Sequence, residues 1–314
     1  MGKIVLTGTN GNLGRVAAQT LIKICDKKDL IFTSSKLEKI ADLAEQGYEC
    51  REANFNDYDQ LVKSFAGGET LLLISLPQVG SKRRRLHTNA VLAARAAGIK
   101  RIVYTSITGC DNLENAGYEI ADHRYLEYLI QAMEFDYVFM RNSQYAEAMV
   151  MAVKGAVENG GILRTGEGDG KMAYVSRKDC GIAAAYAAAG DYHNQVFYIS
   201  GPRLCTVQDF CDVIAPAFGG KVKVEFISDE DSLAAFDAMG VPRTTEGEWL
   251  TEEAKNSPFC SLGMVSFAAA IRKGQMASCT DDFKKLTGME PTSIEDIAAN
   301  ISDYFIGERN ATES

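Results

Sequence analysis

Short apolar runs alternate with segments of helical periodicity along the first half of the chain. Ile4, Val5 and Leu6 form the first run, and residues 16–24 then carry apolar side chains at helical spacing. The same alternation predicts five more strands, at residues 29–33, 49–53, 70–75, 101–105 and 136–140. Strands that alternate with helices form a parallel sheet covered on both faces. We therefore expect an α/β fold, a Rossmann-type doubly wound sheet whose ligand binds at the carboxyl ends of the strands.

The alternation of strands and helices loosens in the second half. Capping boxes at residues 176–179 and 206–209 predict two helices, and residues 196–200 form one more predicted strand, which could return to the main sheet. We expect a doubly wound domain over residues 1–150. A smaller, mostly helical lobe that binds the substrate is expected over residues 151–314.

Three glycines follow the first predicted strand in the spacing G-x-x-G-x-x-G, and an amphipathic helix follows them. A diphosphate needs backbone N–H groups and the positive end of a helix dipole, and glycine lets it approach without a Cβ in the way. A plain strand-to-helix turn does not need three glycines at this spacing. We therefore expect the dinucleotide to be bound by Gly8, Thr9, Asn10, Gly11, Asn12, Leu13 and Gly14.

The end of the second strand bears on the choice of dinucleotide. An acidic residue there binds the 2′-hydroxyl of NAD and repels the 2′-phosphate of NADP. This chain instead has Ser34, Ser35 and Lys36, which can all donate hydrogen bonds to a phosphate. The sequence favours NADP(H) as the cofactor, with NAD(H) as the alternative.

Further cofactor contacts are expected where the other strands end. Asn54 and Phe55 follow the third strand and would lie beside the adenine, although Phe55 fits equally well as a core residue. The nicotinamide would be bordered by residues after the fourth and fifth strands, namely Ser75, Leu76, Pro77 and Thr105.

Composition and charge exclude several classes of function. The net charge of −9 argues against a nucleic-acid-binding surface. The eight cysteines are scattered without a C-x-x-C pair, and the three histidines lack metal-ligand spacing, so neither a disulfide framework nor a metal site is expected. The longest apolar stretch, residues 71–76, is too short to cross a membrane, and no secretory signal precedes the first strand. We expect a cytoplasmic protein that binds a small-molecule substrate.

Several separated segments resemble one family. They are Thr7–Gly14, Leu71–Ser75, Asn89–Gly98, Tyr104–Ser106, Arg141–Asn142 with Tyr145, Gly168–Lys171 and Lys273–Asp282. With these segments the chain resembles the NmrA-like branch of the atypical short-chain dehydrogenases. Within that branch it is most similar to bacterial NAD(P)H:quinone oxidoreductases and triphenylmethane reductases. The resemblance extends over nearly the whole chain.

The resemblance implies a monomer or homodimer with NADPH at the sheet edge and the substrate between the two lobes. Members of the family bind the pyrophosphate through the loop that matches Thr9–Leu13. They usually contact the 2′-phosphate through an arginine at the end of the second strand. This chain has Ser35 at that place, with Lys36 beside it, which weakens the preference for NADPH.

Ordinary short-chain dehydrogenases protonate a carbonyl with a Tyr-x-x-x-Lys pair, in which the lysine lowers the pKa of the phenol. The helix expected at about residues 120–133 has His123 followed four residues later by Glu127, and no lysine in register with a tyrosine. A substrate that accepts hydride at an electron-poor carbon needs little acid catalysis. We therefore predict direct hydride transfer to a quinone or a similar acceptor, in which proximity and alignment do most of the catalysis.

Three residues are candidates for chemistry. Asn142 and Tyr145 follow the sixth strand, where the resemblance also implies substrate contacts, and His123 is a candidate proton donor. Each has a structural alternative: Tyr145 as a buried structural tyrosine, and His123 as a residue of the helix surface. His87 and His193 are expected to be structural or exposed.

Two other classes of function remain open. The chain could be a non-enzymatic NADP-sensing regulator of the NmrA type, which also lacks the tyrosine–lysine pair, or an ene-reductase of a specialised metabolite. The basic run at residues 82–85 is predicted to form a solvated helix face, with an anion contact as the alternative. Trp249 could be a lid over the substrate or a core anchor.

Overall fold

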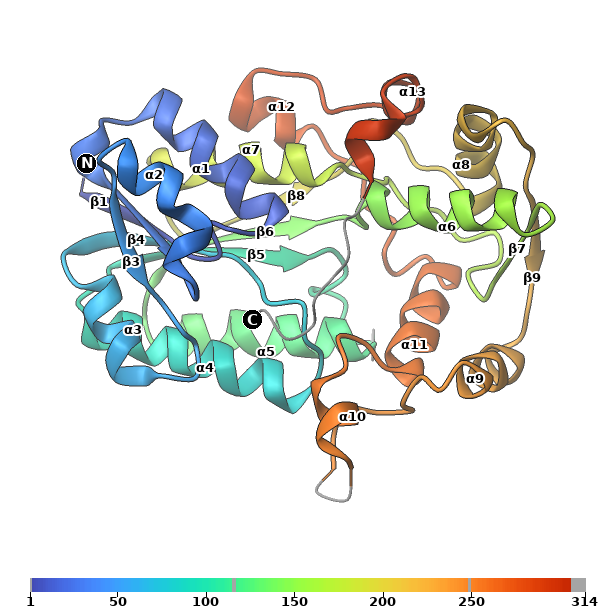
Figure 1. Ribbon diagram of the computed structural model, residues 1–314, viewed down its shortest axis with the longest axis horizontal. Helices are drawn as coiled ribbons and strands as arrows, with labels where there is room; N and C mark the ends of the chain where they lie inside the picture. Colours follow the sequence, from blue (N-terminus) through green and yellow to red (C-terminus); the bar gives the residue numbers. More distant parts are fainter. Residues whose placement is uncertain (1, 115–116, 248–249, 306–314) are drawn as a thin grey trace.

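The computed structural model describes residues 2–114, 117–247 and 250–305. Its main sheet has seven parallel strands in the order β3-β2-β1-β4-β5-β6-β8, and β7 pairs with β9 in a separate parallel pair (Figure 1). The strands are β1 (Lys3–Leu6), β2 (Leu30–Ser34), β3 (Glu49–Glu52), β4 (Gly68–Leu73), β5 (Arg101–Ile107), β6 (Asp136–Asn142), β7 (Ile162–Thr165), β8 (Gln195–Ile199) and β9 (Lys223–Phe226). The predicted doubly wound fold is confirmed.

Helices cover both faces of the main sheet and build the second lobe. They are α1 (Asn12–Ile24), α2 (Ala41–Glu45), α3 (Tyr58–Phe65), α4 (Ser81–Ala96), α5 (Tyr118–Ala132), α6 (Ala146–Glu158), α7 (Arg177–Ala189), α8 (Val207–Ile214), α9 (Asp229–Ala238), α10 (Glu252–Asn256), α11 (Ser261–Arg272), α12 (Asp282–Thr287) and α13 (Ile294–Ala299). A short 3₁₀ turn, η3 (Ala215–Phe218), continues α8.

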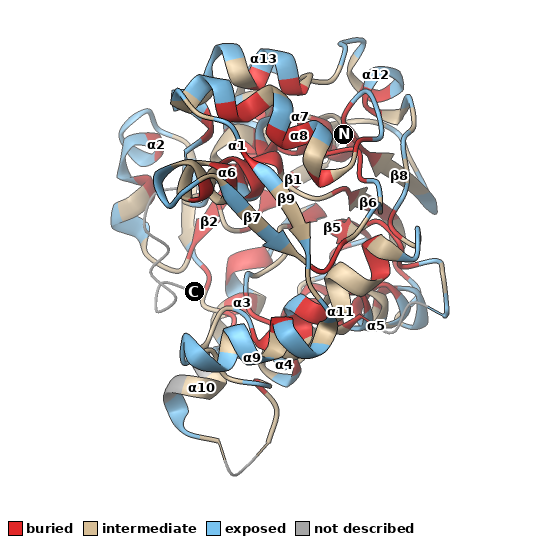
Figure 2. Ribbon diagram, turned by 90° about the vertical axis from the view of Figure 1, so that its right-hand side faces the viewer, coloured by how far each residue is buried: buried red, intermediate tan, exposed pale blue. Residues whose placement is uncertain are grey.

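Alternation along the strands sorts the side chains into two cores. In β1, Ile4 and Leu6 face the core under α1, α7 and α12, whereas Val5 faces the core under α3, α4 and α5. All three side chains are at most 1% exposed, and each such side chain contributes about 1.5–3 kcal/mol by leaving water. Figure 2 shows the buried positions on the sheet and on the inner sides of the helices.

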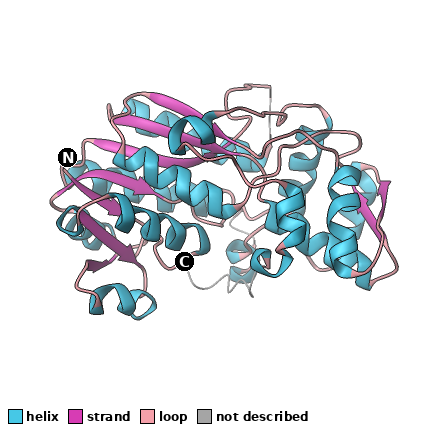
Figure 3. Ribbon diagram, turned by 90° about the horizontal axis from the view of Figure 1, so that it is seen from above, coloured by secondary structure: helices cyan, strands magenta, loops and turns pink. Residues whose placement is uncertain are grey.

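The second lobe lies beyond the carboxyl ends of the strands (Figure 3). Its core is formed by apolar side chains of α6, α8, α11 and α13. The second half of the chain also contributes to the main layers, because β8 pairs with β6 and α7 packs against α1. A Cβ at Gly181 of α7 would lie 2.8 Å from the carbonyl oxygen of Leu13, so this glycine permits the close approach of α7 to the start of α1.

Some local details differ from the sequence prediction. The structure contains α6 and β7, which the apolar pattern did not predict, and β4 ends at Leu73, two residues before its predicted end. The capping box predicted at Ser176 is only half formed. Ser176 accepts from the Asp179 N–H, but the Asp179 carboxylate accepts from Thr292 of the C-terminal segment at 2.8 and 3.0 Å. A distant hydrogen-bond donor has replaced the local one.

Candidate functional site

The glycine turn between β1 and α1 has the backbone geometry of a diphosphate cradle. Gly8 has φ +62°, and its carbonyl oxygen accepts from the Gly11 N–H at 2.9 Å. A Cβ at Gly14 would lie 2.0 Å from that same oxygen, so only glycine fits there. Gly11 is the N-cap of α1 and no side chain caps the helix, which leaves first-turn N–H groups for an anion. The turn therefore fits the diphosphate of a dinucleotide.

The end of β2 is tied to this turn. Ser34 is buried, and its hydroxyl lies 3.0 Å from Asn10 Oδ1 and 2.8 Å from the Lys36 carbonyl oxygen. Ser34 therefore holds the loop in place, while Ser35 and Lys36 are half-buried beside it. The guanidinium of Arg15 pairs with Asp42 at 2.9 Å and donates to the Lys39 carbonyl oxygen.

After β3, the backbone N–H of Asn54 donates to Gln60 Oε1 at 2.8 Å, and Asn54 Oδ1 accepts from the Asn56 N–H. Phe55 is 9% exposed and packs in the core under α3 and α4, with its ring 6.2 Å from that of His87. The structure thus places Phe55 in the core, one of the two alternatives that the sequence left open.

The ends of β4 and β5 are bonded to each other. Thr105 is buried, and its hydroxyl oxygen accepts from the Ser75 N–H at 2.8 Å. The Leu76 N–H donates to His87 Nε2 at 3.2 Å, and burial holds the pKa of His87 well below its ordinary value. Pro77 is exposed. Thr105 and His87 therefore support the β4 loop from within, and Ser75 is half-exposed in it.

Unsatisfied polar atoms gather after β6. Asn142 Nδ2 donates to the Tyr145 hydroxyl at 3.3 Å, which brings two predicted catalytic residues together. Four buried side-chain atoms in this stretch have no hydrogen-bond partner within the described protein: Asn142 Oδ1, Ser143 Oγ, Gln144 Oε1 and Glu147 Oε2. Leaving such an atom unpaired costs about 1–3 kcal/mol, so these atoms call for partners from water or from a bound ligand.

Ser143, Gln144 and Glu147 were missed by the sequence reasoning, although the polar run after a buried strand was a signal. The Tyr145 side chain is held by its neighbours. Burial raises the pKa of its phenol, which stays protonated at neutral pH, and the Arg177 guanidinium lies 5.1 Å from its ring centre. The phenol is therefore a hydrogen-bond donor that does not ionise.

His123 does not lie on the helix surface. It is 6% exposed, with Nδ1 bonded to the Tyr104 hydroxyl at 2.7 Å and Nε2 bonded to Arg83. Both ring nitrogens are thus engaged inside the protein. Burial, then Arg83 and His87, hold the pKa of His123 well below its ordinary value, so the ring is neutral. Direct proton donation by His123 to a substrate would require these bonds to break.

The prediction of a solvated face for residues 82–85 is wrong for two of the arginines. Arg83 is 4% exposed, and Arg84 bridges Asp122 of α5 and Glu246 of the second lobe. The sequence suggested a solvated face because the acidic partners of Arg84 lie far from it in the chain and could not be recognised. Arg85 is exposed, as predicted.

His123 and Glu127 of α5 are four residues apart, the same spacing as in a Tyr-x-x-x-Lys pair, so Glu127 takes the position of the lysine. Glu127 is buried, accepts from the Ser106 hydroxyl at 2.6 Å, and pairs with Arg141 at 2.7 Å. A lysine lowers the pKa of a neighbouring phenol through its positive charge, and a carboxyl group cannot have that effect. The helix therefore lacks the carbonyl-protonating pair.

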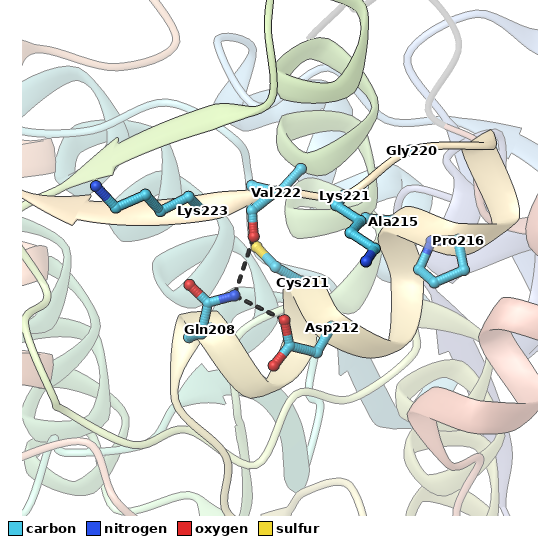
Figure 4. Close-up of a pocket in the computed structure, with 9 residues that line it drawn as sticks. All are labelled: Gln208, Cys211, Asp212, Ala215, Pro216, Gly220, Lys221, Val222 and Lys223. Carbon is cyan, nitrogen blue, oxygen red and sulfur yellow. Dashed lines mark hydrogen bonds between the residues drawn. The ribbon is translucent and has the colours of Figure 1, made fainter.

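Other kinds of site are not found in the part of the chain that the structure describes. Among those residues no group of three or more His, Cys, Asp or Glu side chains could hold a metal ion, and no helix is long and apolar enough to span a membrane. A surface pocket of about 470 Å³ lies on the second lobe between α8, η3 and β9 (Figure 4). None of its lining residues is a predicted site residue, and Gln208 closes one side by donating to Asp212 and to the Val222 carbonyl. Trp249 lies outside the described residues.

Comparisons with known proteins agree with this geometry. A family model described as NAD(P)H-binding matches residues 8–189. Quinone oxidoreductase 2 of Escherichia coli is 31% identical over 241 residues, which are 76% of this chain and 82% of that protein. An NmrA-like family domain-containing oxidoreductase of Aspergillus flavus is 24% identical over 92% of this chain and 91% of its own.

Two solved structures share the whole architecture. The crystal structure of an NADPH-dependent quinone oxidoreductase from Escherichia coli with NADPH superposes with a TM-score of 0.83 at 26% identity, covering 95% of this chain and 99% of that one. The triphenylmethane reductase of Citrobacter sp. with NADP(H) gives a TM-score of 0.78 at 27% identity, with the same coverage of 95% and 99%.

Proposed function

The chain belongs to the NAD(P)H-binding family, in its NmrA-like branch, and from this premise we propose that it is a reductase of quinones or similar electron-poor small molecules. It is an NAD(P)H-dependent oxidoreductase, and NADP(H) is its preferred cofactor. One observation supports an electron-poor acceptor most directly: helix α5 has no Tyr-x-x-x-Lys pair that could protonate a carbonyl. The buried polar atoms without partners at the end of β6 mark where such an acceptor would bind.

The chain's own residues suit this cofactor. The first-turn N–H groups of α1, at Asn12, Leu13 and Gly14, would hold the diphosphate, and Ser35 and Lys36 are the residues proposed to contact the 2′-phosphate. NADPH, when bound, supplies the hydride. We propose that Asn142 and Tyr145, at the carboxyl end of β6, orient the acceptor as hydrogen-bond donors and acceptors. His123 supports the site from behind, because its two nitrogens bond to other side chains.

We further propose that the substrate lies between the sheet edge and the second lobe. Tyr145 pairs with Val175 in an isolated bridge, and Arg84 joins α4 and α5 to Glu246 of the second lobe. The eight cysteines are free thiols, which supports a reducing compartment such as the cytoplasm. A homodimer is compatible with this arrangement, and sedimentation velocity of the purified chain would decide between monomer and dimer.

Steady-state oxidation of NADPH against a panel of acceptors tests the proposal. We expect turnover with soluble benzoquinones and naphthoquinones, slower turnover with NADH, and none with simple aldehydes or ketones, which need an acid catalyst. Binding of NADPH without turnover of any quinone, dye or polarised enone would contradict the proposal and favour a cofactor sensor.

A further inference from the structure

A buried arginine lies directly behind the end of β4. Arg83 is 4% exposed, and its Nη2 donates both to Ser75 Oγ and to His123 Nε2, while Nη1 donates to the Gln78 carbonyl oxygen at 3.3 Å. Its Nε is buried with no hydrogen-bond partner. Burying a guanidinium against neutral partners is costly, so the charge at this position calls for a functional explanation.

The carboxylates near Arg83 are engaged elsewhere. Asp122 accepts from the Gly80 N–H at 2.6 Å and pairs with Arg84, which also pairs with Glu246. Glu127 accepts from Ser106 and pairs with Arg141. Within the part of the chain that the structure describes, none of these acids has a direct hydrogen bond to Arg83. Arg83 is therefore the cation that contacts the Ser75 hydroxyl.

The hydrogen-bond network assigns the protons around Ser75. A guanidinium only donates, so His123 Nε2 accepts from Arg83, and the neutral ring carries its proton on Nδ1. That proton is donated to the Tyr104 hydroxyl oxygen at 2.7 Å. Ser75 Oγ accepts from Arg83, so the hydrogen of the Ser75 hydroxyl remains to be donated to another acceptor.

Ser75 lies beside the cofactor turn. The preceding residue, Ile74, donates its N–H to Thr7 Oγ1 at 2.9 Å, and a Cβ at Gly8 would lie 3.5 Å from the Ile74 Cβ. The Ser75 N–H is fixed by Thr105 of the neighbouring strand. Figure 1 shows β4 between β1 and β5, with α4 and α5 covering one face of these strands. Ser75 therefore lies just after the carboxyl end of β4, and the residue before it, Ile74, contacts the glycine turn.

We propose that the Ser75 hydroxyl, held by Arg83, is the donor that stabilises the oxyanion formed on a neutral quinone-type acceptor. This inference rests on the proposed reductase function and deepens it. Uptake of hydride by such an acceptor reduces it by two electrons, and the C=O π pair moves onto oxygen, which takes a proton from water afterwards. A cationic triarylmethane instead becomes neutral on taking up hydride, so it gains nothing from this donor. Arg83 is a positioning residue, and the site favours quinones over cationic dyes.

Substitution of either residue tests this selectivity. We expect Ser75→Ala and Arg83→Met to lower kcat/KM for a neutral quinone about 10- to 100-fold, as loss of an oxyanion donor does, while a cationic triarylmethane dye changes less than about 3-fold. Arg83→Lys should restore part of the quinone activity. The matched control is Arg85→Met, from the exposed side of the same helix, and it should leave both activities unchanged.

A binding measurement separates this role from a structural one. 4-Nitrophenol serves as an oxyanion analogue, and its absorbance reports the ionised fraction when it is bound to the complex with NADP⁺. Wild type should lower the apparent pKa of the bound phenol relative to Ser75→Ala, and melting temperatures should show that Ser75→Ala is folded.

The outcomes distinguish the two proposals. An unchanged quinone-to-dye ratio in Ser75→Ala, or a bound phenol with the same pKa in both proteins, would overturn the role of Ser75. Turnover of neither acceptor by wild type would instead overturn the proposed function.

Discussion

At the scale of single residues, function is marked by polar atoms that the fold leaves without partners. Asn142, Ser143, Gln144 and Glu147 each bury one such atom after β6. The sequence indicated Asn142 and Tyr145, because polar residues at a strand's carboxyl end lie at the ligand edge of a parallel sheet. It could not indicate which neighbouring polar atoms lack partners, because that depends on side chains brought in from α7 and the β8 region.

Tyr145 tests this cluster. Burial raises the pKa of its phenol, which stays a neutral donor throughout the neutral range, so Tyr145→Phe removes a hydrogen bond without changing a charge. We expect kcat/KM for quinones to fall about 10-fold, the equivalent of about 1.4 kcal/mol, with an unchanged pH profile between pH 6 and about 9. The matched control is Tyr128→Phe, on the exposed face of α5. Loss, in Tyr145→Phe, of an ionisation present in the wild-type profile would show that the phenol titrates in wild type.

Glu167, in the loop after β7, should weaken the fold as pH rises. It is 8% exposed, its Oε2 has no hydrogen-bond partner, and burial raises its pKa to about 7 from 4.5. At a pH between these two values, Glu167 is therefore protonated in the folded protein and ionised in the unfolded chain. Folding is penalised progressively as pH rises from about 4.5 to 7, by up to about 3 kcal/mol.

Urea unfolding at two pH values measures this penalty. Glu167→Gln should be more stable than wild type at pH 8, and the difference should vanish near pH 4. The exposed Glu158→Gln serves as the control and should show no such dependence. Equal stability of Glu167→Gln and wild type at pH 8 would show that the carboxylate is hydrated in the folded state.

At the scale of elements, the sequence predicted correctly those features that depend on neighbouring residues, and it failed for those that depend on residues distant in the chain. The glycine turn and the start of α1 depend on two glycines in particular, because Gly8 has a positive φ and a Cβ at Gly14 would collide with the Gly8 carbonyl oxygen, which is why the spacing alone was informative. The basic run of α4 was misjudged because Asp122 and Glu246, the partners of Arg84, come from α5 and from the second lobe. Only half of the capping box predicted at Ser176 forms, again because of a partner distant in sequence: Thr292 donates both its N–H and its hydroxyl to the Asp179 carboxylate.

Alanine at two glycines should have opposite effects. In Gly14→Ala the added Cβ would lie 2.0 Å from the Gly8 carbonyl oxygen, so the turn must open. We expect at least a 10-fold loss of NADPH affinity in a fluorescence titration, and a loss of stability of about 1–3 kcal/mol from overpacking.

The matched control is Gly155→Ala in the middle of α6, where a Cβ would meet no atom within 4 Å. That change should stabilise the fold by about 0.5–1 kcal/mol through helix propensity and leave NADPH binding unchanged. Equal NADPH affinity of Gly14→Ala and wild type would mean that the cofactor does not use the turn.

At the scale of the whole molecule, the two lobes meet at the carboxyl edge of one sheet. Residues 177–199 return to this sheet as α7 and β8, whereas α6, α8, α11 and α13 enclose a separate core. The sequence predicted the strand at 196–200, but it did not indicate that β7 pairs with β9. Short strands of low apolar content are specified by their partners more than by their own residues.

A ligand that binds only the folded protein stabilises it by mass action. At a concentration 100-fold above its Kd, NADPH should raise the free energy of unfolding by about 2.7 kcal/mol, and the melting temperature by several degrees. NADH at the same concentration should give a smaller shift, because it lacks the 2′-phosphate that Ser35 and Lys36 are proposed to bind. Differential scanning fluorimetry with both cofactors measures this, and a larger shift with NADH would reverse the assigned preference.

The most direct test of hydride transfer is an anaerobic single turnover. Protein carrying one equivalent of NADPH is mixed with excess soluble quinone, and the near-ultraviolet absorbance of NADPH is followed with protiated cofactor and with cofactor deuterated at the nicotinamide C4. We expect the bound NADPH to be consumed in one phase that is slower with deuterium. Persistence of bound NADPH with every quinone, or a rate indifferent to deuterium under conditions where binding and product release are faster, would contradict a direct hydride transfer.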